Sequence, residues 1–248
     1  MCTTCGCGIA HRHEPMTVTV LRDLLAENDQ QAAHNREHFD EHGVLAINLM
    51  SSPGAGKTAL LETTIATLKG EYAVGVIVGD LETENDAVRI RAQGVPAVQI
   101  TTGQACHLDA HLVHRALHEL PLAGFDIVFI ENVGNLVCPA SFELGQHRNV
   151  TLLSVTEGHD KPAKYPVMFR AADLVLLTKT DLLPHLDDFR PELAEQALRS
   201  LASHAPMFAL SAQTGAGMER WYQWLRQQAE TRYSQRRLAS ASPVAVRT

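Results

Sequence analysis

The sequence predicts an α/β protein of three layers, with helices on both faces of a mostly parallel sheet of about seven strands. From residue 44 onward, short apolar runs alternate with helical stretches, which is the pattern of βα units. Several runs are apolar throughout, as expected for strands that are covered on both faces. The runs occupy residues 44–50, 73–78, 97–101, 126–130, 150–155, 174–178 and 207–210.

Length and composition favour one such domain with appendages. We expect a flexible tail over 1–16, a helix over 17–43, the α/β domain over 44–230 and a disordered tail over 231–248. The net charge of −7 and the absence of a long basic run argue against nucleic-acid binding. The sequence has neither a secretory signal nor an apolar run of roughly 20 residues, the length of a membrane span. We therefore expect a cytoplasmic protein without membrane insertion.

The first residues contain a cluster of cysteines. Cys2, Cys5 and Cys7 form C-x2-C-x-C, and three soft thiolates on so short a segment can converge on one ion. If Met1 is removed, the amine of Cys2 is a fourth donor, which suits Ni(II) in a square plane, whereas Zn(II) prefers a tetrahedron. The alternative is a reactive tail whose cysteines cluster by accident.

Residues 17–43 read as one helix that ends at Gly43. His34, His38 and His42 are four residues apart and so share one face of this helix. Histidines with this spacing can chelate a metal, but such a stripe is more often a solvated face, and we favour that interpretation.

The run Ser51–Thr58 organises the rest of the chain, because a strand-like run precedes it and a helical run follows it. Gly54 and Gly56 let successive N–H groups turn toward phosphate oxygens, and the new helix adds its positive end. Lys57 supplies a cation for the terminal phosphates, and Thr58 offers a hydroxyl to Mg²⁺. The alternative is a Gly-rich turn with a chance Lys-Thr.

Two carboxylates follow strands at the same edge of the predicted sheet. Asp80 is placed to meet the Mg²⁺ held by Thr58, although it could instead cap a helix. Glu131 ends a hydrophobic strand, as in a Walker-B strand, and can position Mg²⁺ or a water. Gly134 then lies where the γ-phosphate can be sensed.

A base-selecting signal follows the strand at 174–178. In Lys179-Thr180-Asp181 the carboxylate can accept both N1–H and N2–H of guanine, which favours GTP over ATP. The usual Asn before the lysine is replaced by Thr178, which removes an amide that contacts the base or ties loops together. Ser211-Ala212 follows the last strand, where a backbone N–H can meet the guanine O6.

A second group of cysteine and histidine residues lies in loops that leave this edge of the sheet. Cys106, His107 and Cys138 can therefore approach one another and form a metal site near the nucleotide. The alternative is a pair of buried cysteines that act as small hydrophobes. His111, His114 and His118 continue the stripe on one helix, and we assign them to the surface.

With these pieces in place, the chain resembles the HypB family, the hydrogenase nickel-incorporation GTPases, over nearly its whole length. The resemblance rests on the C-x2-C-G-C start, Ser51–Thr58 and four further segments, at 80–86, 106–110, 131–139 and 157–162. It implies a dimerising P-loop GTPase that delivers Ni²⁺ to the large subunit of [NiFe]-hydrogenase with the HypA chaperone.

The resemblance also implies roles for individual residues. It makes Cys2, Cys5 and Cys7 the tight metal site, and the Cys106 group the weaker one, coupled to nucleotide and placed at the dimer interface. Lys161 and Lys164 would reach across that interface. The expected cofactors are GTP or GDP, Mg²⁺, Ni²⁺ and Zn²⁺. The nucleotide-binding residues are Pro53, Gly54, Ala55, Gly56, Lys57, Thr58, Lys179, Asp181, Ser211 and Ala212, and the catalytic ones are Lys57, Thr58, Asp80 and Glu131.

Two other functions stay open at this point. One is a chaperone GTPase that serves urease or a cobalamin enzyme, although the N-terminal cysteines favour the hydrogenase system. The other is a metal-storage protein whose nucleotide site is only regulatory, although the chain has no long histidine tract.

Overall fold

The computed structural model describes residues 16–103 and 105–241 of the chain. Cys2, Cys5 and Cys7 of the predicted N-terminal metal site lie outside the described residues.

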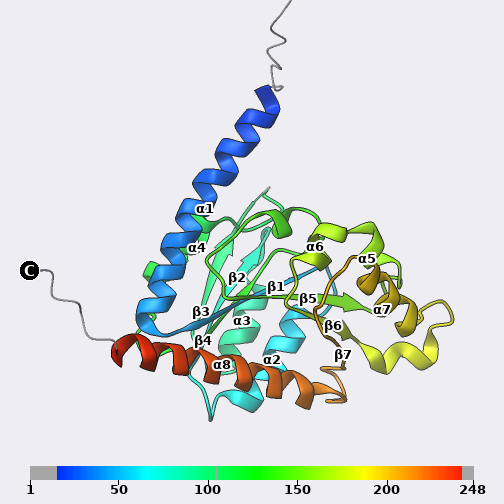
Figure 1. Ribbon diagram of the computed structural model, residues 1–248. Coiled ribbons are helices and arrows are strands. Elements are labelled where there is room, and N and C mark those ends of the chain that lie inside the picture. The colour runs from blue at the N-terminus through cyan, green and yellow to red at the C-terminus, as the bar shows by residue number, and fades with distance from the viewer. Residues whose placement is uncertain (1–15, 104, 242–248) are drawn as a thin grey trace, which may run out of the picture.

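Seven parallel strands form one sheet in the order β3-β2-β4-β1-β5-β6-β7 (Figure 1). Each predicted strand is present, with its ends within two residues of the prediction. The predicted fold class is therefore confirmed, and the sheet is parallel throughout. The strands are β1 Leu45–Ser51, β2 Val74–Asp80, β3 Ala97–Thr101, β4 Ile127–Glu131, β5 Arg148–Ser154, β6 Leu174–Thr178 and β7 Met207–Ala209.

Alternate side chains of each strand point to opposite faces, and helices cover both (Figure 1). In β4, Phe129 packs with Trp221 beneath α2, α3 and α8, whereas Ile130 packs on the opposite face beneath α1 and α4. The helices are α1 Met16–His42, α2 Lys57–Leu68, α3 Asn85–Ala92, α4 Ala110–Glu119, α5 Lys161–Lys164, α6 Pro166–Arg170, α7 Pro191–Ser200 and α8 Met218–Ala241, with short 3-10 helices η1 Cys138–Ser141 and η2 Thr180–His185.

Helix α1 runs along α4, and its N-terminal part extends beyond the sheet (Figure 1). Asn28 ties it to the body, since its side chain accepts a hydrogen bond from Ala110 N at 2.9 Å and donates one to Glu143 O at 2.9 Å. The helix ends at the predicted residue, because Gly43 adopts φ +70°. None of the helices in the described part of the chain has the length and apolarity needed to cross a membrane.

Helix α8 is longer than the sequence predicted. The expected disordered tail began at residue 231, but the helix continues to Ala241. Arg232 forms an ion pair with Asp40 on α1, and the Tyr233 hydroxyl donates a hydrogen bond to Asp126 beside β4. These two contacts with distant parts of the fold stabilise the last turns of α8, whose polar sequence did not predict that they pack against the protein.

Candidate nucleotide and metal sites

The loop between β1 and α2 has the geometry of a phosphate-binding loop. Gly54 and Gly56 adopt φ of +74° and +97°, a region that favours glycine. Gly56 is the N-cap of α2, so the positive end of that helix faces the loop. Lys57 is buried and donates a hydrogen bond from Nζ to Ser51 Oγ at 3.0 Å. Ser51, which replaces the usual first glycine, therefore holds the lysine in this structure.

The side chains of Thr58 and Glu131 meet behind this loop. Thr58 Oγ1 donates to Glu131 Oε1 at 2.8 Å, while Glu131 Oε2 is buried and has no hydrogen-bond partner among the described residues. Burial raises the pKa of Glu131 to about 7, although Lys57 and the Thr58 hydrogen bond oppose the rise. A buried carboxylate with a spare oxygen beside a threonine hydroxyl fits a Mg²⁺ site.

Asp80 ends β2 and lines the same cleft. It does not cap α3, whose N-cap is Glu84. Its carboxylate instead accepts hydrogen bonds from Leu81 N at 2.8 Å and from the amide and hydroxyl of Thr83. Partial burial opposes a fall in the pKa of Asp80, but these hydrogen bonds hold that pKa below its usual value. The carboxylate is thus ionised at neutral pH, as a Mg²⁺ ligand must be.

The phosphate-binding loop opens onto two clefts that share Gly56, Ala59 and Lys179. A cleft of about 490 Å³ contains the phosphate-loop residues, Asp80 and Glu131. A second, of about 300 Å³, contains the predicted base-binding residues Asp181, Ser211 and Ala212. In it, Asp181 Oδ1 is buried without a hydrogen-bond partner in the part of the chain described here, as a carboxylate awaiting the N–H groups of guanine would be.

Thr178 has a structural role that the sequence did not suggest. Its hydroxyl donates to Ala55 O in the phosphate loop at 2.8 Å. The threonine therefore ties the base loop to the phosphate loop, one of the two functions of the asparagine that it replaces.

The second cysteine–histidine group comes together within the chain. Cys106 Sγ donates to Cys138 Sγ at 3.0 Å and lies 3.8 Å from His107 Nδ1, and the three ligand atoms lie within 4.8 Å of one another. The hydrogen bond from Cys106 is the main cause that raises the pKa of the Cys138 thiol, while burial lowers the pKa of His107. A neutral imidazole and two thiols are a ligand set for a soft or borderline metal ion.

Sequence reasoning missed two charged residues in the phosphate cleft. Asp86 and Arg89 of α3 line it, and Arg89 forms an ion pair with Glu62 of α2 at 2.5 Å. Their i, i+3 spacing just after Asp80 was the available signal. Asn132 belongs to the predicted segment 131–139 but had no role of its own in that prediction, and it lies between the candidate nucleotide and metal sites, as described below.

Comparison with known proteins places this geometry in a family. The nucleotide-binding domain of the CobW/HypB/UreG family matches residues 45–209. The chain belongs to the CobW/HypB/UreG family. The family is one of GTPases, so the chain is a GTPase with the P-loop fold, and its high-identity relatives are HypB hydrogenase maturation factors.

Three similar proteins illustrate the match. Hydrogenase maturation factor HypB of Rhizobium leguminosarum bv. viciae is 51% identical over 91% of this chain and 77% of its own length. Hydrogenase/urease maturation factor HypB of Helicobacter hepaticus is 44% identical over 79% of this chain and 81% of its own. The crystal structure of HypB from Helicobacter pylori in complex with nickel superposes with a TM-score of 0.78, 40% identity, and coverage of 84% and 97%. These relatives place the chain in the HypB branch of the family.

Proposed function

We propose that this chain is a nickel metallochaperone for [NiFe]-hydrogenase, in which the nucleotide state controls an ion held by Cys106, His107 and Cys138. The observation that carries the proposal is a hydrogen-bonded connection between the two sites. A relative of known structure is described as a complex with nickel, which supports the choice of metal.

The connection begins at Asn132, directly after Glu131. Asn132 Oδ1 accepts a hydrogen bond from Leu108 N at 3.2 Å, and Asn132 Nδ2 donates to Asn48 on β1. Farther along the same loop, Asn135 Nδ2 donates to Cys106 O at 3.2 Å. A shift of segment 131–135 when nucleotide binds would therefore move the backbone on both sides of His107 and the loop that leads to Cys138.

The residues that line the cleft support the catalytic roles that we propose. Lys57 would bind the terminal phosphates, Asp181 would bind the guanine, and Thr58, Asp80 and Glu131 would hold Mg²⁺. When bound, the Mg²⁺ supplies positive charge against the phosphate oxygens. The chain itself contributes the loop amides and the buried lysine, which are fixed before the nucleotide arrives.

The same proposal covers the parts that lie beyond the described residues or beyond one chain. Cys2, Cys5 and Cys7 form a second site for Ni²⁺ or Zn²⁺. This chain works with a HypA-type chaperone to deliver nickel to the hydrogenase large subunit. The transfer takes place in the cytoplasm, where reducing conditions keep these thiols free. The chain works as a homodimer, although Lys164 pairs locally with Asp160 at 2.6 Å in a single chain.

A Ni²⁺ titration tests the coupling. The full chain is loaded with GDP or with a non-hydrolysable GTP analogue, and we expect Ni²⁺ affinity at the Cys106 site to differ between the two. Linkage requires Ni²⁺ to change the ratio of the GTP-analogue affinity to the GDP affinity by the same factor by which exchanging GDP for the analogue changes the Ni²⁺ affinity. The variant Asn135→Ala should reduce the difference in Ni²⁺ affinity between the two nucleotide states. The double variant Cys106→Ser/Cys138→Ser, which lacks the thiols of the site, should abolish it. Equal affinity in both nucleotide states would refute the coupling.

A second candidate function is nickel supply to urease, because the Helicobacter hepaticus relative is named a hydrogenase/urease maturation factor. A deletion strain separates the two. Loss of hydrogenase activity that excess nickel restores supports the first function, whereas loss of urease activity alone supports the second.

A further inference from the structure

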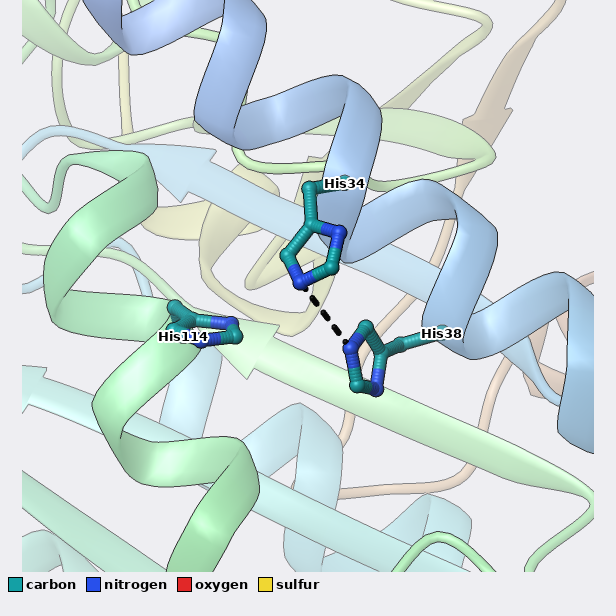
Figure 2. A group of neighbouring side chains, drawn as sticks. All are labelled: His34, His38 and His114. Atoms are coloured by element: carbon teal, nitrogen blue, oxygen red, sulfur yellow. Dashed lines mark hydrogen bonds between the residues drawn. The ribbon is translucent and has the colours of Figure 1, made fainter.

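Three histidines from two helices meet outside the nucleotide and cysteine sites. His34 and His38 lie one turn apart on α1, and His114 faces them from α4 (Figure 2). Each offers a ring nitrogen within 4.8 Å of the other two. The sequence placed each histidine on a solvated face, and it could not show that the two faces pack against each other.

The spacing of these rings suits a metal ion. His34 Nε2 and His38 Nε2 are 3.1 Å apart. Two nitrogens bound to one tetrahedral Zn²⁺ at the usual bond length are roughly 3.3 Å apart. The hydrogen bond that joins the two rings thus holds them close to the separation that a shared ion requires.

The third ring is held in the tautomer that a ligand needs. Asn35 is fully buried, and its Nδ2 donates to Ala110 O at 2.8 Å and to Leu144 O at 3.1 Å, which fixes the orientation of the amide. Asn35 Oδ1 is therefore the acceptor that faces His114 Nδ1 at 3.0 Å, so that nitrogen carries the proton. In a neutral ring, Nε2 then keeps its lone pair, the arrangement found behind most histidine ligands.

We propose that His34, His38 and His114 form a third metal site, which takes a divalent transition-metal ion such as Ni²⁺ or Zn²⁺ and joins α1 to α4. Imidazole suits both ions, and three protein nitrogens leave a position open for water or a transfer partner. The site is independent of the proposed nucleotide coupling. His34 is 51% exposed, so the ion can enter from solvent.

The test uses the full chain with its five cysteines replaced by serine, which removes every thiolate ligand. Ni²⁺ alone and Zn²⁺ alone are titrated by calorimetry, and X-ray absorption identifies the donors. We expect one ion to bind with imidazole nitrogens. His34→Gln/His38→Gln/His114→Gln in this background should lose that ion. The variant His111→Gln, one turn from His114 on α4, should keep the bound ion. His111 is not one of the three clustered histidines, and its Nε2 lies 3.9 Å from Glu27 Oε1 instead.

Two further measurements guard against a misfolded triple variant. His34→Gln alone changes a half-exposed ring, and loss of this ligand should weaken binding by at least about tenfold. Bound metal should also slow amide exchange in α1, and it should do so only where all three histidines are present. The proposal is overturned if the cysteine-free chain binds no ion, or if the triple variant binds as tightly as its parent.

Discussion

Glu131 is the buried carboxyl group of the proposed magnesium site, and its protonation predicts a pH dependence. Its pKa in the nucleotide-free protein is raised to about 7 by burial. At Glu131 the folded chain holds a proton that the unfolded chain has lost between about pH 4.5 and 7, so the contribution of Glu131 to stability falls as pH rises through this window.

The comparison variant is Glu131→Gln, which cannot ionise. We expect the free energy of unfolding of the wild type to fall relative to Glu131→Gln between pH 5 and 8, by at most about 3 kcal/mol. Urea denaturation without nucleotide measures this difference. Parallel pH profiles for the two proteins would contradict the raised pKa.

Removing the Thr178 hydroxyl should lower nucleotide affinity. Thr178→Val keeps the shape of the side chain but loses the hydrogen bond to Ala55 O, which contributes about 1 kcal/mol. The phosphate and base loops then separate more easily, so GDP affinity should fall about fivefold. Thr178→Ser retains the hydroxyl and should bind like the wild type. Fluorescent GDP binding gives both values, and equal affinity of the valine variant would show that the contact is dispensable.

Replacing Gly134 should lower nucleotide affinity for a purely steric reason. A Cβ on this residue would lie 2.8 Å from the Cα of Pro53, so Gly134→Ala must displace the phosphate loop. We expect nucleotide affinity to fall at least about tenfold, a loss of about 1.4 kcal/mol. Gly70→Ala is the control, because a Cβ there meets nothing within 4 Å. Fluorescent GDP binding to both variants gives the affinities, with circular dichroism to verify folding, and equal affinity of Gly134→Ala and Gly70→Ala would contradict the steric argument.

At the scale of elements, the sequence predicted the sheet and the edge that carries the site because buried parallel strands are largely apolar. Cys106 and Cys138 could be paired in advance, since both follow strands that end at this edge. The histidine cluster could not be predicted in this way. His34 and His114 meet because α1 packs along α4, where Asn28 and Asn35 both hydrogen-bond Ala110.

The sequence did not predict the last turns of α8 for a related reason. This segment is polar, and it is held by two contacts with residues far away in the sequence. Deletion of 231–248 removes the Arg232–Asp40 ion pair and the Tyr233–Asp126 hydrogen bond. We expect the free energy of unfolding to fall by about 1–3 kcal/mol, measured by urea denaturation. Deletion of 242–248 alone is the matched control. If the two truncations are equally stable, the contacts of 231–241 contribute nothing.

At the scale of the whole molecule, the proposed dimer needs a contact surface close to both the phosphate cleft and the Cys106 group. Val137, beside Cys138, is 60% exposed, and Leu81 at the rim of the phosphate cleft is 43% exposed. Nucleotide binding can order the loops that carry these apolar side chains, so that a second copy covers them. The GTP-bound chain should therefore dimerise more readily than the GDP-bound chain.

Val137→Asp tests this surface, because a carboxylate buried at an interface without a partner is unfavourable. We expect its dimer to need at least about tenfold more protein in the presence of a GTP analogue, which corresponds to 1.4 kcal/mol. Leu193→Asp is the control, since Leu193 is 42% exposed on α7 and lines neither cleft. Sedimentation velocity with each nucleotide, with and without Ni²⁺, gives the monomer fraction. A Val137→Asp variant that dimerises like Leu193→Asp would place the interface elsewhere, and the metal pair would then act within one chain.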